Sequence, residues 1–200
     1  MTVPDRRPGR PARYSLDELL EVVVGEFNAR GYDATSMADL ARATGLTKSS
    51  IYHHVAGKEE LLRLAVARAV DALFAVLAEP GATTGPAVGR LEHVVRRSVE
   101  VLADRLPDVT LLLRVRGNTG AERWALERRR EFDKRLSALV QAAIDEGDVR
   151  ADVDPRLVTR LLFGTVNSVV EWYRRDGAHS AQEIADAVVA TAFGGLTRRG

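Results

Sequence analysis

Apolar residues recur along this chain at every third or fourth position, the spacing that places side chains on one face of an α-helix. The spacing predicts a helix over residues 15–31, two short helices within 37–55 and a long helix over 58–78. Ser15 and Glu18 form a capping-box pattern that opens the first helix. No segment keeps the alternation of apolar and polar residues that is typical of a half-buried strand, so the fold is predicted to be all-α.

The second half of the chain shows the same periodicity, interrupted by proline and glycine. The stretch 79–89 contains both residue types repeatedly and predicts a loop. Pro107 is expected to stop a helix, and Asp154 followed by Pro155 is expected to open one. The helices predicted beyond the loop are 91–106, 109–115, 121–146, 155–173 and 181–193.

Residues 35–58 hold the densest set of signals. Gly45 suits the left-handed conformation that ends a helix, and Thr47 suits the cap of the next one. Two short helices joined by a tight glycine turn form a helix-turn-helix. The inward side chains are predicted to be Met37, Leu40, Ala41 and Thr44 in the first helix and Ile51 and Val55 in the second.

The outward face of the second short helix carries hydrogen-bonding groups and no carboxylate, which suits a helix that enters the major groove of DNA. Adjacent His53 and His54 diverge by about 100° on a helix, so they do not converge on a metal ion. No metal and no cofactor is expected. The outward side chains are Lys48, Ser49, Ser50, Tyr52, His53 and His54.

The segment GYDATSMADLARATGLTKSSIYHHVAGKEELL, residues 31–62, resembles the DNA-binding segment of the TetR/AcrR family of transcriptional regulators. The resemblance implies that Thr35 and Ser36 bind phosphate and that Lys58 clamps another. It also implies that Lys48, Ser49 and His53 touch base edges. Tyr52 and His54 would meet the DNA backbone or brace the motif; the alternative is that both simply pack within a three-helix domain.

The composition narrows the partners that such a protein can have. With 200 residues, of which 46% are hydrophobic, the chain can bury a core, and its net charge of only +1 means that DNA affinity must come from locally concentrated charge. The absence of cysteine excludes thiolate chemistry and fits a cytoplasmic protein. No apolar run approaches the roughly 18 residues of a membrane span, so no membrane partner is expected.

The first 13 residues contain four arginines, three prolines and one acidic residue, a composition that predicts disorder in isolation. An arginine arm beside a helix-turn-helix can enter the neighbouring minor groove, which makes Arg6, Arg7 and Arg10 candidate DNA contacts. A solvated tail is the alternative. The predicted organisation is a basic arm (1–12), a DNA-binding domain (13–73, with the motif at about 36–55) and a ligand-binding and dimerisation domain (74–200).

The last two predicted helices are apolar on more than one face. A homodimer built through a four-helix bundle would cover them, as the family resemblance implies, and would present two recognition helices to a palindromic double-stranded operator. Burial of both helices within one monomer is the alternative.

Residues 111–132 and the helix from 155 onward combine apolar and aromatic residues with arginines, a mixture that suits a pocket with an apolar interior and a cationic mouth. Arg128 lies on the inward stripe, whereas Arg129 and Arg130 are expected to be solvated. The stretches SVVEWYR and FGGLTRRG resemble family members that respond to acyl-coenzyme A thioesters. The candidate ligand-binding residues are Leu112, Arg114, Arg116, Trp124, Arg128, Phe132, Phe163, Asn167 and Trp172.

These features predict a transcriptional repressor that a small-molecule effector releases from DNA. The leading candidate for the effector is an acyl-coenzyme A thioester, and a hydrophobic drug or lipid is the alternative. Separately, the arginines could form a solvated face paired with glutamates. A further alternative is a constitutive DNA-binding protein without a ligand. The latter would not need the large domain that follows the motif. An enzyme would need a converging nucleophile, base or metal set, and the sequence shows none.

Overall fold

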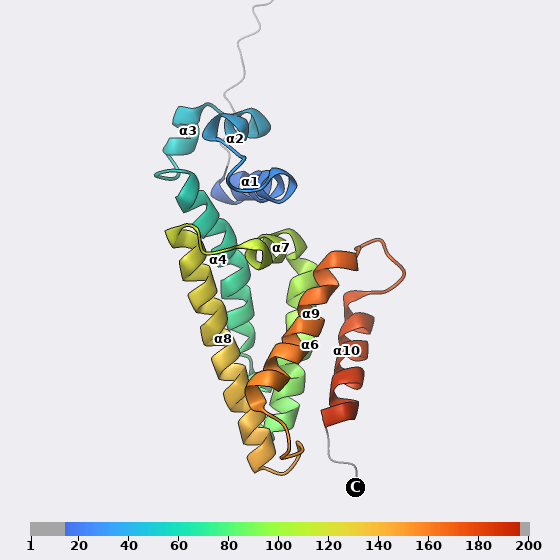
Figure 1. Ribbon diagram of the computed structural model, residues 1–200. Helices are drawn as coiled ribbons and strands as arrows, with labels where there is room; N and C mark the ends of the chain where they lie inside the picture. Colours follow the sequence, from blue (N-terminus) through green and yellow to red (C-terminus); the bar gives the residue numbers. More distant parts are fainter. Residues whose placement is uncertain (1–14, 197–200) are drawn as a thin grey trace, which may run out of the picture.

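The computed structural model describes residues 15–196, and in this part of the chain ten α-helices follow one another without a strand (Figure 1). The predicted all-α class is confirmed. The helices are α1 (Leu16–Arg30), α2 (Met37–Thr44), α3 (Lys48–Tyr52), α4 (Lys58–Val76), α5 (Pro80–Thr83), α6 (Ala87–Asp104), α7 (Leu106–Arg114), α8 (Gly120–Asp145), α9 (Pro155–Trp172) and α10 (Ala181–Leu196).

The N-terminal domain consists of α1, α2, α3 and the first turns of α4. Ser15 and Glu18 form the predicted capping box, and Thr47 caps α3 by accepting the Ser50 N–H. Gly45 has a φ of 70°, the left-handed conformation that a residue with a Cβ adopts reluctantly, and it turns the chain from α2 into α3. The helix-turn-helix prediction is confirmed. Its α3 is shorter than predicted, because it ends at Tyr52, before the buried Val55.

The long helix α4 joins this domain to the C-terminal domain, which comprises the rest of α4 and α5 to α10. In Figure 1, α2 and α3 lie at one end of the molecule, and α4 runs from beside them down along α8. Its buried positions, such as Leu61, Ala65, Ala69 and Val76, continue along one side of the whole helix. A movement of α4 therefore reaches both domains.

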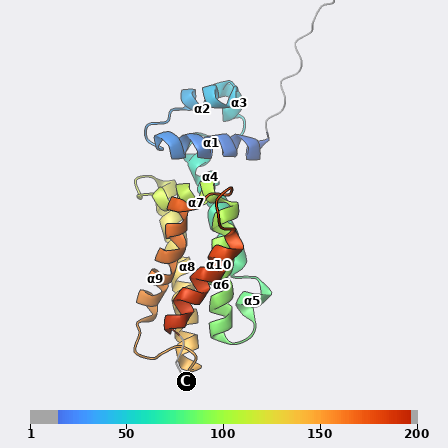
Figure 2. The ribbon, with the colours of Figure 1, turned by 90° about the vertical axis from the view of Figure 1, so that its right-hand side faces the viewer.

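The C-terminal domain is a bundle in which α6 packs against α8, α9 and α10 (Figure 2). Thr119 and Glu122 form a capping box at the start of α8, and the Asp154 carboxylate accepts two N–H groups at the start of α9. None of the helices in residues 15–196 is long and apolar enough to cross a membrane.

Two predicted boundaries were wrong. The stretch expected to be a loop contains the one-turn helix α5, and α6 already begins at Ala87. Pro107 lies inside the first turn of α7 instead of ending a helix, because the first turn has no use for the N–H that proline lacks. The break between α6 and α7 falls at Arg105.

Candidate functional site

Helices α2 and α3 lie at the end of the N-terminal domain farthest from the bundle, and the turn after α3 leads back into α4 (Figure 1). The side chains of Lys48, Ser49, Tyr52, His53 and His54 are exposed, and none forms a hydrogen bond or ion pair with another residue between 15 and 196. They are free to bind a partner.

Ser50 differs from these five. It is half-buried, and its hydroxyl shares a 2.8 Å hydrogen bond with the hydroxyl of Thr47, so it helps to close the start of α3. Within the described segment, no group of three or more His, Cys, Asp or Glu residues is placed to hold a metal ion.

The three residues expected to bind phosphate are engaged within the protein. Thr35 is fully buried, and its hydroxyl donates to the Gly31 carbonyl at 2.7 Å. Ser36 is exposed, but its N–H donates to Asp39 at 3.0 Å. The Lys58 ammonium donates to the Tyr32 carbonyl at 2.9 Å and lies 4.2 Å from the centre of its ring.

Thr35 therefore has no exposed hydroxyl for DNA in this arrangement, and a phosphate would have to compete with Asp39 or Tyr32 at the other two positions. The candidate arm residues Arg6, Arg7 and Arg10 lie outside the described residues.

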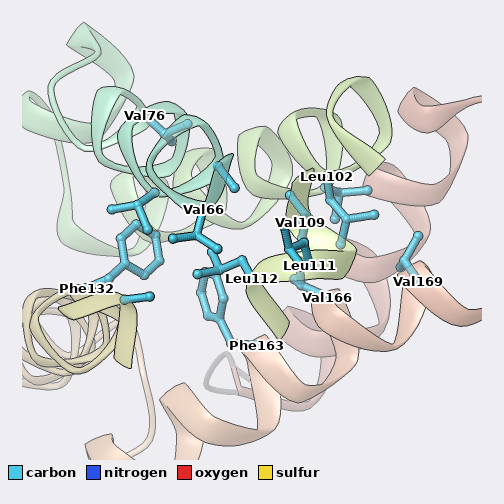
Figure 3. Packing of buried hydrophobic residues seen from close by; sticks show 14 of the residues in the cluster. Val66, Val76, Leu102, Val109, Leu111, Leu112, Phe132, Phe163, Val166 and Val169 are labelled. Carbon is cyan, nitrogen blue, oxygen red and sulfur yellow. The ribbon is translucent and has the colours of Figure 1, made fainter. Parts of the chain in front are cut away.

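A cavity of about 290 Å³, here called the central cavity, lies between α4, α6, α7, α8 and α9. Phe132 packs edge-to-face on both Phe74 and Phe163, with ring centroids 5.7 and 5.3 Å apart. Figure 3 shows Phe132, Phe163 and Leu112 approaching one another from α8, α9 and α7. The candidate ligand residues that line the central cavity are Leu112, Arg128, Phe132, Phe163 and Asn167.

Three arginines reach the wall of the central cavity. Arg128 lies over the ring of Phe74, 3.9 Å from its centre, and makes no ion pair with the nearby glutamates. Arg129 also lines the cavity, so the expectation that it is merely solvated was wrong. Desolvation lowers the pKa of Arg129, and the Asp133 carboxylate partly opposes this. Arg160 is exposed and marks the mouth.

A more open groove of about 720 Å³, here called the basic groove, lies beside the central cavity between α8 and the start of α9. The two share Asp133 and Arg160 in their walls. Cations outnumber anions in the basic groove, whose other charged residues are Arg130, Lys134, Asp154 and Arg156. An anion at the mouth of the central cavity would therefore meet several positive charges.

Four candidate ligand residues lie elsewhere. Arg114 and Arg116 line a crevice between the two domains, and Trp172 is 52% exposed on the outer face of α9. Trp124 stacks against Arg63 of α4, with the guanidinium 4.6 Å from the ring centre. The structure thus separates these four from the central cavity: Trp124 and Trp172 face other sides of α8 and α9 than Phe132 and Phe163 do, and Arg114 and Arg116 lie at and beyond the end of α7.

Two of these four residues, Arg114 and Trp124, lie at the contact between the two domains. Arg114 donates to the Asn28 carbonyl at 2.7 Å, while the Asn28 amide donates to the Pro107 carbonyl at 2.8 Å, which ties α1 to α7. Beside the Trp124 contact, the Glu59 carboxylate of α4 accepts the Ala121 N–H at the start of α8, at 3.0 Å. The helices that line the central cavity are thus fastened directly to the N-terminal domain.

Sequence reasoning missed Arg129, Asp133 and Arg160. The helical spacing could have identified Arg160 as a lining residue. It precedes Phe163 by three residues and Asn167 by seven, so it lies on the same face of α9. Arg129 likewise precedes Phe132 by three residues. Nothing in the sequence pairs Asp133 of α8 with Arg160 of α9, because that proximity depends on how the two helices pack.

An exposed helix-turn-helix joined by one helix to a bundle with an internal cavity defines a ligand-responsive class of DNA-binding regulator. The family model of bacterial regulatory proteins of the tetR family matches residues 19–65, and that of the tetracyclin repressor-like C-terminal domain matches residues 84–196. The second match alone covers more than half of the chain. This protein belongs to the TetR family.

Similarity to individual proteins supports this family assignment. SCO3833, a TetR family member from Streptomyces coelicolor A3, is 62% identical in sequence, and its crystal structure superposes with a TM-score of 0.84 over 90% of this chain and 91% of that one. The transcriptional repressor KstR2 of Mycobacterium tuberculosis is 29% identical over 92% of this chain and 93% of its own length. Its structure, described as that of a ketosteroid transcriptional regulator, has a TM-score of 0.84 and covers 95% of this chain and 100% of that one.

The structure of AibR in complex with isovaleryl coenzyme A and operator DNA has a TM-score of 0.78 over 89% of this chain and 97% of that one. At 24% identity, this likeness concerns the fold alone.

Proposed function

We propose that this protein is a homodimeric repressor, acting in the cytoplasm, that an acyl-coenzyme A thioester releases from a palindromic operator. The observation that carries the effector class is the central cavity, which is apolar inside and opens at arginines beside the basic groove. The relative KstR2 is a transcriptional repressor, which supports repression over activation as the mode of regulation. AibR, which shares this fold, was crystallised with isovaleryl coenzyme A and operator DNA, and this supports the proposed effector class.

The DNA-binding surface is the free face of α3. Lys48, Ser49 and His53 contact base edges in this proposal, whereas Tyr52 and His54 contact the DNA backbone. Lys58 serves as a phosphate contact if it exchanges its hydrogen bond to the Tyr32 carbonyl for one to DNA. Ser36 remains a phosphate candidate through its exposed position at the start of α2.

The dimer forms through α9 and α10. Leu157, Leu161 and Trp172 are 56%, 64% and 52% exposed and lie on one face of α9. Exposed large apolar side chains in line along a helix are typical of a surface that a partner covers. Small residues on the exposed side of α10, among them Ala187 and Ala190, allow a second helix to approach closely. Two copies joined in this way form a four-helix bundle and present two α3 helices to DNA.

The size of the central cavity implies that only one part of the effector enters it. An apolar cavity of about 150 Å³ in another protein holds benzene, so about 290 Å³ suits an acyl group of about one or two rings. Coenzyme A is far larger and has to remain outside. Arg129 at the wall, Arg160 at the mouth and the cations of the basic groove then lie where its phosphates leave the cavity.

Release from DNA follows from the joint between the domains. An effector that wedges α8 away from α4 disturbs the hydrogen bond between Glu59 and Ala121 and the stacking of Arg63 on Trp124. Both contacts act on the first two turns of α4, next to the helix-turn-helix. The effector needs only a differential affinity for the two arrangements of α4, typically worth about 1 to 3 kcal/mol.

The test is to titrate acyl-coenzyme A thioesters and the matching free acids against the complex of the protein with an operator selected from random DNA. We expect the thioester to release DNA at concentrations at which the free acid does not. Arg129→Ala and Arg160→Ala should each narrow that gap by about tenfold, while operator affinity without effector stays unchanged. Arg150→Ala is the matched control, because Arg150 is an exposed arginine paired with Asp152, away from the cavity.

If the central cavity instead binds a hydrophobic drug or lipid, the coenzyme A thioester should have no advantage over the free acid. Release by free acids alone, or by neither compound, would rule out the coenzyme A proposal. Insensitivity of the protein to any small molecule would favour a constitutive DNA-binding protein.

A further inference from the structure

One buried hydroxyl in the C-terminal domain has no hydrogen-bond partner. Ser98 of α6 is completely buried, and its Oγ pairs with no other atom in residues 15–196. Several other hydroxyls in the helices of this domain donate to a carbonyl of the preceding turn, as Thr110 does to Leu106 at 2.7 Å and Thr159 does to Pro155 at 2.8 Å. Ser98 does not make the equivalent bond.

Ser98 forms part of the wall of the central cavity. The buried lining residues around it on α6, α7 and α9 are apolar, among them Leu102, Val109, Leu112 and Val166. The charged lining residues lie on α8 and α9, where Arg160 marks the mouth. The central cavity is thus lined by charged residues on α8 and α9, by the half-buried Asn167, and by apolar side chains along most of its wall, and Ser98 is its fully buried polar residue.

A hydroxyl at this point weakens the folded protein unless something pairs with it. Burying a hydroxyl removes its hydrogen bonds to water, and an alanine would fill nearly the same volume without that loss. The other buried side-chain atoms without a hydrogen-bond partner among the described residues belong to Glu26, Asn28 and Arg68, which do not line the central cavity. Among the described residues, only Ser98 has an unpaired buried atom in the wall of the central cavity, where the effector can supply the missing partner.

We propose that Ser98 binds a ketone or hydroxyl oxygen carried by the effector at the end of its acyl group remote from the thioester. The hydroxyl donates to a ketone oxygen or accepts from a ligand hydroxyl, since serine can do both. The effector class is then an oxygenated, ring-sized acyl group, and not a plain hydrocarbon chain. This inference rests on the proposed function for the thioester end, whereas the oxygen at the buried end depends on Ser98 alone.

The experiment compares two thioesters that differ in a single oxygen, cyclohexanepropionyl-coenzyme A and 4-oxocyclohexanepropionyl-coenzyme A, as releasers of the protein from its operator. The unmodified protein should respond to the ketone at about tenfold lower concentration, as one hydrogen bond in a buried site provides. Ser98→Ala should abolish that preference while leaving the response to the hydrocarbon unchanged. Ser168→Ala should keep the preference, because the Ser168 hydroxyl is exposed and donates to the Thr165 carbonyl.

Ser98→Ala is expected to fold, and its melting temperature without ligand should equal or exceed that of the unmodified protein, because no hydrogen bond is lost. Equal responses to the two thioesters, or a ketone preference that survives Ser98→Ala, would overturn the inference while leaving the proposed function in place. If neither thioester releases DNA, thermal stabilisation by the coenzyme-free pair decalin and 1-decalone decides. A ketone preference that Ser98→Ala abolishes would then support the inference without the proposed function. The absence of such a preference would contradict both the inference and the proposed function.

Discussion

The central cavity differs in construction from the exposed surface of α3 and the turn after it, here called the α3 surface, which is formed by Lys48, Ser49, Tyr52, His53 and His54. The residues of the α3 surface lie within seven consecutive positions, Lys48 to His54, and a local turn and two caps orient them. The cavity draws its wall from five helices, with Val70 at one end of the sequence range and Asn167 at the other. One site is a property of a short segment, and the other is a property of the packed domain.

This difference bears on how each site tolerates change. The exposed α3 side chains make no hydrogen bond or ion pair with the other described residues, so replacing them should cost little stability, and the effect should appear mainly in DNA binding. The cavity side chains also form the core of the bundle, so most of them contribute to folding and ligand binding together. Arg160 and Ser98 are exceptions, because the side chain of neither makes a hydrogen bond within residues 15–196.

The largest expected effect comes from replacing a side chain of the cavity wall. Phe132 is buried between Phe74 and Phe163, so Phe132→Ala should lower the free energy of unfolding by about 3 kcal/mol or more. Tyr52→Ala, the aromatic control on α3, should change it by less than about 0.5 kcal/mol while weakening operator binding. Urea denaturation measures both. Comparable destabilisation by the two substitutions would erase the distinction between the sites.

The next effect concerns base recognition by the α3 surface. Lys48→Ala and His53→Ala should each weaken binding to the specific operator by about 1 to 3 kcal/mol, with unchanged thermal stability, because both side chains are exposed and free. Fluorescence anisotropy on operator and random DNA separates specific from general binding. Lys134→Ala removes the same charge from the C-terminal domain and should leave both affinities unchanged. Equal losses on operator and random DNA would reassign Lys48 to the phosphate backbone.

A smaller effect should appear where the two sites communicate. Glu59→Ala removes the carboxylate that binds the start of α8, so the effector should lower operator affinity by about 1 kcal/mol less than it does in the unmodified protein. The measurement is operator affinity with and without saturating effector. Glu127→Ala, an exposed α8 position without a hydrogen bond or ion pair among the described residues, should leave the difference intact. An undiminished effector response in Glu59→Ala would mean that the signal passes through another contact.

The smallest effect is local to α2. Hydrogen bonds from the Ser36 hydroxyl and N–H hold the pKa of Asp39 at about 2. Because this value lies below the ordinary pKa of about 3.9, the capping box contributes its stabilisation above about pH 4 and loses it as the pH falls toward 2. Carbon NMR titration should show the low pKa in the unmodified protein and a higher one in Ser36→Ala. The pKa of Asp152, which Arg150 lowers, should not move. An ordinary Asp39 titration in the unmodified protein would contradict the capping geometry.

The helices and the helix-turn-helix could be predicted from the sequence, because they depend on contacts between near neighbours. Periodicity marks the buried face of a helix, and caps such as Ser15 with Glu18 or Thr47 with Ser50 span three residues. The errors occurred where a residue type permits two outcomes. Pro107 either ends a helix or enters the first turn of the next, and the local sequence alone does not distinguish these.

Which charged residues face the central cavity could not be predicted from the sequence, because it depends on how the helices pack. Arg114 and Arg128 have the same chemistry, but packing turned the first toward Asn28 in α1 and the second toward Phe74 in α4. Packing likewise brought Arg160 of α9 beside Asp133 of α8 and left the Ser98 hydroxyl in the cavity wall without a partner. The rotation of each helix about its own axis sets these contacts, and that rotation results from all the side chains buried in the bundle together.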